Sequence, residues 1–155
     1  MYDDLTWHSP PADWSVKGNR LTVVTGERTD FWGRTHYGFV RTNGHLLYRE
    51  VAGDFTAEVS AVLTRDGWSD WSTSVASDEE VRAGLRVRLT RHGDVVRVQR
   101  RDGNGTWHLV RLGHLALPPV AQVGVMCCSP ERAGFRAVFS DLVIGPAIAR
   151  DLHEA

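Results

Sequence analysis

Apolar and polar residues alternate along several segments of the chain, which is the pattern of a strand with one buried face. The longest segments are 54–64, where every second residue from Phe55 to Leu63 is apolar, and 81–89. Others lie at 5–7, 21–25, 95–99, 106–112, 121–128 and 134–144. No helix of useful length is indicated. The pattern therefore predicts an all-β, antiparallel two-sheet sandwich.

One turn signal stands out between these segments. Asn43-Gly44 separates Phe39-Val40 from Leu46-Leu47, and both turn residues tolerate the positive φ that a type I′ turn needs. We therefore predict a β-hairpin centred on Asn43-Gly44. The surrounding sequence also concentrates side chains with a flat apolar face and one polar atom, which suit sugar and small-ligand surfaces: Trp32, His36, Tyr37, His45 and Tyr48.

Length and composition indicate one domain without membrane contact. The chain has 155 residues, of which 42% are hydrophobic and 24% charged, enough for one core but short for two. We expect a single domain over 1–146 and a tail over 147–155. No apolar run approaches the ~20 residues of a membrane span. The acidic N-terminus lacks a signal-peptide pattern, so the expected location is cytoplasmic.

The net charge argues against a nucleic-acid-binding protein, and the cysteine content argues against a disulfide-stabilised or metal-binding one. The net charge of −1 argues against a nucleic-acid binder, although seven arginines fall between Arg82 and Arg101. The only cysteines, Cys127 and Cys128, are adjacent in a predicted strand and should point to opposite faces. They therefore offer neither a disulfide framework nor metal-ligand spacing, and we expect both to be reduced packing residues.

Several motifs resemble the DUF1349 family, also labelled "regulation of enolase protein", which is similar to concanavalin A-like lectins and glucanases. The resemblance rests on Trp-x-x-Thr-His-Tyr-Gly-Phe at 32–39, Gly-Asp-Phe-Thr-Ala-Glu-Val at 53–59, Val-Gly-Val-Met-Cys at 123–127 and Phe-x-Asp-Leu-x-Ile at 139–144. It extends from about Trp7 to Ile144. The resemblance implies that the sandwich is a concanavalin A-like jelly roll.

The chain departs from the family pattern after Val59. Family members carry there a segment with Asp-Gln-Ala-Gly-Leu-Met and a strand with Trp-x-Lys-x-Gly-x-Glu, whereas here Ser60 follows directly. Two missing strands leave backbone groups without hydrogen-bond partners. These groups must pair with other strands of the chain or with a partner chain, or else the fold is less stable. We predict that residues 55–64 form an exposed edge. This edge should cause self-association or a marginally stable monomer, with weaker ligand binding than in a full-length relative.

The sequence offers little catalytic chemistry. A retaining glucanase needs two close carboxylates, commonly as Glu-x-Asp-x-Glu on one strand, and no such triplet occurs. No Gly-x-Ser-x-Gly elbow or phosphate-binding glycine loop is present, and no third metal ligand accompanies His36 and His45. We therefore expect a noncatalytic protein with no metal and no cofactor. A sugar-active enzyme is the least favoured alternative.

Two functions remain open. The first is a noncatalytic domain that binds a small saccharide or polyhydroxy metabolite by ring stacking and hydrogen bonds from a carboxylate. Its candidate ligand-binding residues are Trp32, His36, Tyr48, Asp70 and Trp71. The second is a regulatory protein that contacts another protein through an arginine-lined strand face. That face would consist of Arg82, Arg86, Arg88 and Arg97.

Overall fold

The computed structural model describes residues 2–34, 38–64 and 84–151, and the regular structure among them is entirely β-strand. The strands in chain order are β1 (Thr6–His8), β2 (Asp13–Lys17), β3 (Arg20–Val24), β4 (Phe31–Trp32), β5 (Arg41–Thr42), β6 (His45–Ala52), β7 (Phe55–Thr64), β8 (Leu85–His92), β9 (Val95–Arg101), β10 (Trp107–His114), β11 (Val120–Cys127) and β12 (Arg136–Gly145).

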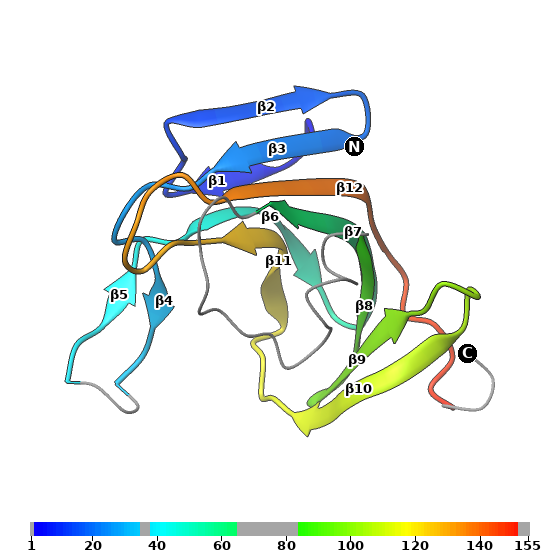
Figure 1. The fold of residues 1–155 in the computed structure, drawn as a ribbon. Coiled ribbons are helices and arrows are strands. Elements are labelled where there is room, and N and C mark those ends of the chain that lie inside the picture. The colour runs from blue at the N-terminus through cyan, green and yellow to red at the C-terminus, as the bar shows by residue number, and fades with distance from the viewer. Residues whose placement is uncertain (1, 35–37, 65–83, 152–155) are drawn as a thin grey trace.

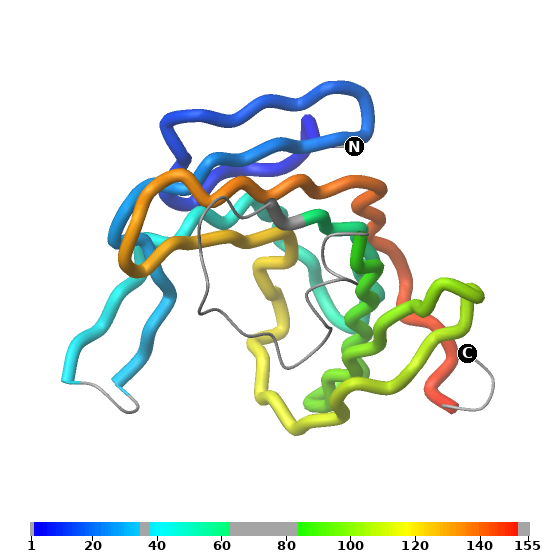
Figure 2. Tube along the Cα trace, in the orientation of Figure 1, coloured from blue at the N-terminus to red at the C-terminus, as the bar shows by residue number. Residues whose placement is uncertain are grey.

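These strands form two large antiparallel sheets and one small one (Figure 1). Sheet A has three strands in the order β1-β6-β11, and sheet B has seven in the order β10-β9-β8-β7-β12-β3-β2. The remaining strands, β4 and β5, pair with each other. Figure 2 follows the chain from β10 into β11, which carries it from the edge of sheet B to the edge of sheet A. The predicted all-β, two-sheet sandwich is confirmed.

Sheet A packs on one part of sheet B. The larger core cluster joins β6 and β11 to β3 and β12, with Leu21, Val23 and Ala137 fully buried at its centre. A smaller cluster joins Phe55 of β7 to Ala121 and Val123 of β11. The core therefore lies between sheet A and strands β3, β12 and β7, and sheet B continues beyond it as β8, β9 and β10.

Strand β7 lies inside sheet B and not at its edge. It pairs with β12 on one side and with β8 on the other, in a register that runs from Phe55 opposite Arg91 to Ala61 opposite Leu85. The predicted exposed edge over residues 55–64 is therefore wrong. The next described strand along the chain, β8, takes the neighbouring place and satisfies the backbone groups of β7.

Asn43 and Gly44 do not form a hairpin. The preceding strand β5 pairs with β4, whereas the following strand β6 pairs with β1 and β11. Neither residue has a positive φ. Instead, the amides of Asn43 and Gly44 both donate to the carbonyl oxygen of Asp30, at 3.0 and 2.9 Å, and Oδ1 of Asn43 accepts from the Asp30 amide at 3.0 Å. The hairpin prediction is wrong, since these residues link the small sheet to sheet A.

Candidate functional site

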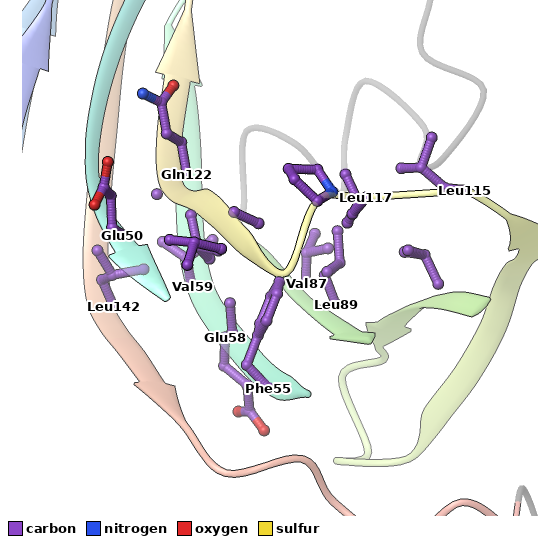
Figure 3. A pocket seen from close by; sticks show the side chains of 17 residues that line it. Glu50, Phe55, Glu58, Val59, Val87, Leu89, Leu115, Leu117, Gln122 and Leu142 are labelled. Carbon is purple, nitrogen blue, oxygen red and sulfur yellow. The ribbon is translucent and has the colours of Figure 1, made fainter. Parts of the chain in front are cut away.

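A largely aliphatic cavity of about 680 Å³ lies where sheet B extends beyond sheet A. The inward-facing residues of β7, β8 and β9 form its floor, namely Phe55, Ala57, Val59, Val87, Leu89 and Val96. The segment that links β10 to β11 closes one side with Leu115, Leu117 and Pro118 (Figure 3). We call this cavity the groove.

The edge of β11 forms another wall of the groove. All five residues from Val120 to Gly124 line it, although Ala121 and Val123 are buried and the other three are exposed. Successive side chains of a strand point to opposite faces, so side chains alone would place only every second residue in the cavity. Because consecutive residues line it, we infer that the backbone edge of β11 faces the groove. Among the described strands, β11 pairs with β6 alone. Its groove-side backbone groups therefore have no partner strand within residues 2–34, 38–64 and 84–151.

Few polar groups point into the groove. Glu58 lines it, but its carboxylate lies on the other face of sheet B and pairs with Arg86 at 2.9 Å. Figure 3 shows the carboxylate of Glu50 and the amide of Gln122 also directed away from the labelled aliphatic side chains. The lining thus suits a ligand that gains affinity by burying apolar surface, at roughly 25 cal/mol per Å², and offers little to a sugar hydroxyl.

The arginine face that the sequence predicts as a protein contact surface is largely covered. Arg88 and Arg97 are only 6% and 2% exposed, so the prediction of an exposed surface is wrong for both. Arg86 is half-buried and occupied by its ion pair. Arg82, the fourth member, lies outside the described residues.

Arg88 shows how this face is held together. Its Nε and Nη2 donate to Oε1 of Gln99 at 3.1 and 2.9 Å, and its guanidinium lies over the ring of Trp107, 4.3 Å from the centroid. Burial lowers the pKa of Arg88, and the nearby Glu58 carboxylate partly opposes that shift. These contacts make the arginines part of the packing between strands.

The structure does not bring the described members of the predicted saccharide site together. Trp32 lies in β4 of the small sheet and Tyr48 lies in β6 of sheet A, and both are half-buried. The other three residues lie outside the described part of the chain: His36, Asp70 and Trp71. The saccharide site therefore stays a prediction.

The sequence pattern does not predict the groove. It identifies the floor residues only as the buried face of alternating strands, because alternation does not tell how far one sheet extends across the other. The one related signal is the shortening after Val59, because it falls within β7, which forms part of the floor.

Other chemistry at the described residues is limited. Within 2–34, 38–64 and 84–151, no three His, Cys, Asp or Glu side chains gather in a way that would hold a metal ion. Cys127 is a buried free thiol and Cys128 a half-buried one, and burial raises the pKa of Cys127 to about 12. None of the described segments is a helix with the length and hydropathy needed to span a bilayer.

Comparison with known proteins finds relatives over most of the chain. The family model described as "Protein of unknown function (DUF1349)" matches residues 7–61 and 58–147. A Saccharomyces cerevisiae protein named "Regulation of enolase protein 1" is 31% identical over 187 residues, with 96% of this chain and 93% of the yeast protein covered. A crystal structure of a functionally unknown protein from Saccharomyces cerevisiae matches with a TM-score of 0.84 and 28% identity, covering 96% of this chain and 99% of the yeast chain.

The same comparisons locate a shortening of this chain. The two segments that match the family model overlap at residues 58–61, within β7. Because 96% of 155 residues is about 149, an alignment of 187 residues leaves about 38 positions without a counterpart here. The yeast relative therefore has additional chain, and the pairing of β7 with β8 closes sheet B without it.

Proposed function

This chain belongs to the DUF1349 family, and we propose that it is a noncatalytic binding protein whose groove receives an extended, apolar segment of a partner protein. The segment pairs its backbone with the open edge of β11 and places alternate side chains on the floor formed by β7 and β8. The observation that carries this proposal is the unbroken run from Val120 to Gly124, which lines the groove with its backbone edge.

The composition of β11 supports strand addition. Exposed edges of natural sheets are usually guarded by lysine, proline, inward-pointing charges or bulges. The strand Val120–Cys127 contains no charged residue and no proline, and Gln122 is its only side chain with a strong hydrogen-bonding group. Backbone pairing gives such a complex its affinity, while the pockets for alternate side chains give its specificity.

The shortening of the chain supports the same kind of occupant. β7 and β8 are direct neighbours, so family strands that follow β7 in longer relatives have no place between them in sheet B. The open edge nearest to β7 is that of β11, which packs on β7 through Ala121 and Val123. A partner strand at this edge thus covers the part of β7 and β8 that lines the groove. The name of the yeast relative makes enolase a defined candidate partner.

A displayed library of random peptides, selected on the purified chain, tests this proposal. We expect the enriched peptides to alternate apolar and polar residues, and their binding to protect the β11 amides from hydrogen exchange. Val87→Asp places a charge on the groove floor and should abolish binding. Leu109→Asp is the matched control, because Leu109 is an exposed apolar residue of β10 outside the groove.

Three results would contradict strand addition at β11. They are enriched peptides without alternation, binding that survives Val87→Asp, and unchanged exchange along β11 in the complex. The same pair of variants, mixed with purified yeast enolase, tests the defined partner. Enolase binding that both variants retain would locate the contact elsewhere on the molecule.

A saccharide is the second candidate ligand, through the residues that the sequence predicts: Trp32, His36, Tyr48, Asp70 and Trp71. Its support is that both described members are only half-buried, so part of each ring is accessible for stacking. A glycan array, read at low and high salt, separates the two candidates. Saccharide binding should change little with salt and should be unaffected by Val87→Asp, whereas loss of the glycan signal in that variant would contradict a site at these residues.

A further inference from the structure

A second, smaller cavity lies on the opposite face of sheet B, beside the turn from β8 to β9. Its volume is about 170 Å³, and it is lined by His92, Val95, Arg97, Leu112 and Arg150. Val96 points into the groove and its neighbour Arg97 points away from it, as successive strand residues do. The sheet therefore separates this cavity from the groove, and the tail after β12 supplies one of its walls.

Arg97 is a buried cation with little compensation. It is 2% exposed and donates a hydrogen bond from Nη2 to the carbonyl oxygen of Ala149 at 3.0 Å. Its Nε and Nη1 are buried and have no hydrogen-bond partner among the described residues, and the same holds for Nε2 of His92 in this cavity. No described carboxylate forms an ion pair with Arg97. A buried charge whose N–H groups lack acceptors is costly, so this arrangement favours an anion.

The charges around the cavity also favour an anion. Arg150 is an exposed second cation on its wall. The pKa of Arg88 is lowered by burial, raised in part by Glu58 and lowered again by the charge of Arg97. The carboxylate of Asp54 contacts His92, with Oδ2 of Asp54 3.7 Å from Nδ1 of His92, but Nδ1 is not the unpartnered nitrogen of that ring. Among the ion pairs of the described residues, none compensates the positive charge of Arg97.

We propose that this cavity binds a phosphate group, held by Nε–H and Nη1–H of Arg97 with Arg150 as the second cation. A phosphate carries up to two negative charges and several acceptor oxygens, which match two arginines. Charge-assisted hydrogen bonds of this kind are strong beside apolar walls such as Val95 and Leu112. Because Ala149 covers the guanidinium, the anion enters as the tail moves outward, and its binding then fixes the tail against sheet B.

Isothermal titration calorimetry of the whole chain with inorganic phosphate, at an ionic strength held constant with sodium chloride, tests the proposal. We expect saturable binding. Arg150→Gln changes an exposed residue and should weaken it about tenfold or more, as the loss of one charge-assisted hydrogen bond implies. Arg97→Gln should abolish it. Arg111→Gln removes an exposed arginine of β10 that does not line the cavity, and should leave the affinity unchanged.

Absence of saturable binding, or equal affinity in Arg150→Gln and the unchanged chain, overturns the proposal even if Arg97→Gln fails to fold. Glycerol phosphate in place of inorganic phosphate distinguishes the source of the group. Tighter binding of the ester indicates a phosphorylated molecule, and tighter binding of inorganic phosphate indicates the free ion. Val87→Asp blocks the groove on the other face and should leave phosphate binding intact, so this proposal and the proposed function fail separately.

Discussion

Gly124 is the position where the pairing of β11 with β6 leaves no room for a side chain. A Cβ at Gly124 would lie 2.7 Å from Cα of Tyr48 and 2.8 Å from the carbonyl carbon of Leu47, and closer still to the Leu47 carbonyl oxygen. Ordinary van der Waals contacts of a Cβ lie at 3.4–4 Å. All three obstacles are backbone atoms of β6, so no rotamer change relieves them and β11 itself must move.

The expected cost of Gly124→Ala follows from this geometry. Overpacking a core costs ~1–3 kcal/mol when neighbouring side chains can yield. Here the backbone must yield, which also strains ladder hydrogen bonds whose net contribution is ~0.5–1.5 kcal/mol each. We expect Gly124→Ala to lower the free energy of unfolding by about 3 kcal/mol or more. Such a loss is a large part of the ~5–15 kcal/mol that stabilises a typical domain.

Urea unfolding followed by tryptophan fluorescence measures this difference. Gly145→Ala is the matched control, because Gly145 ends β12 with a negative-φ backbone and nothing within 4 Å of the added Cβ. Alanine there should be neutral or stabilise by about 0.4–1 kcal/mol. Equal midpoints for the two variants would refute the close approach of β11 to β6. They would also remove the basis for placing the β11 edge in the groove.

Gly44→Val should lower stability by about 1 kcal/mol or more, because its Cβ would lie 2.5 Å from Cε2 of Phe31 and not because of a positive φ. Adding Phe31→Ala should recover part of the loss in urea midpoint, and no recovery would contradict this cause. Burial raises the pKa of Tyr2 from 10.0 to about 12. The folded state thus favours the neutral phenol, so this contribution to stability is complete below pH 10.0 and is lost as the pH rises toward about 12. Tyr2→Phe should lose less stability than the unchanged chain across that window, and identical pH profiles of the urea midpoint would contradict the assignment.

Alternation predicts strands well where one face is buried. Segments 95–99 and 134–144 correspond to β9 and most of β12, since their buried faces select apolar residues at every second position. The strand Asp13–Lys17 was not predicted, because all five of its residues are exposed and no burial imposes a pattern. The family resemblance is confirmed. Its motifs include core positions such as Phe55 and Val125, where burial also selects apolar residues.

The sequence-based predictions that are wrong have a common physical cause, which is contact between segments far apart in the chain. Asn43-Gly44 carries a local turn signal, but the carbonyl oxygen of Asp30 accepts hydrogen bonds from both amides. The Phe31 ring occupies the space beside Gly44. Arg97 is polar in an alternating strand and was expected to face water, but it is covered by Ala149, which lies 52 residues further along. The position of the groove depends in the same way on the placement of the two sheets.

The unguarded edge of this sandwich lies on another strand than the sequence predicts. β7, where the sequence predicted the edge, is paired on both sides. The two edges of sheet B carry charges that guard them, with Arg111 on β10 and with Asp13 and Lys17 on β2. β11 has no such residue and borders an aliphatic cavity. Unguarded edges recruit other strands, so the β11 edge, which has no second partner strand among the described residues, is the reason that the proposed function assigns a partner strand to this position.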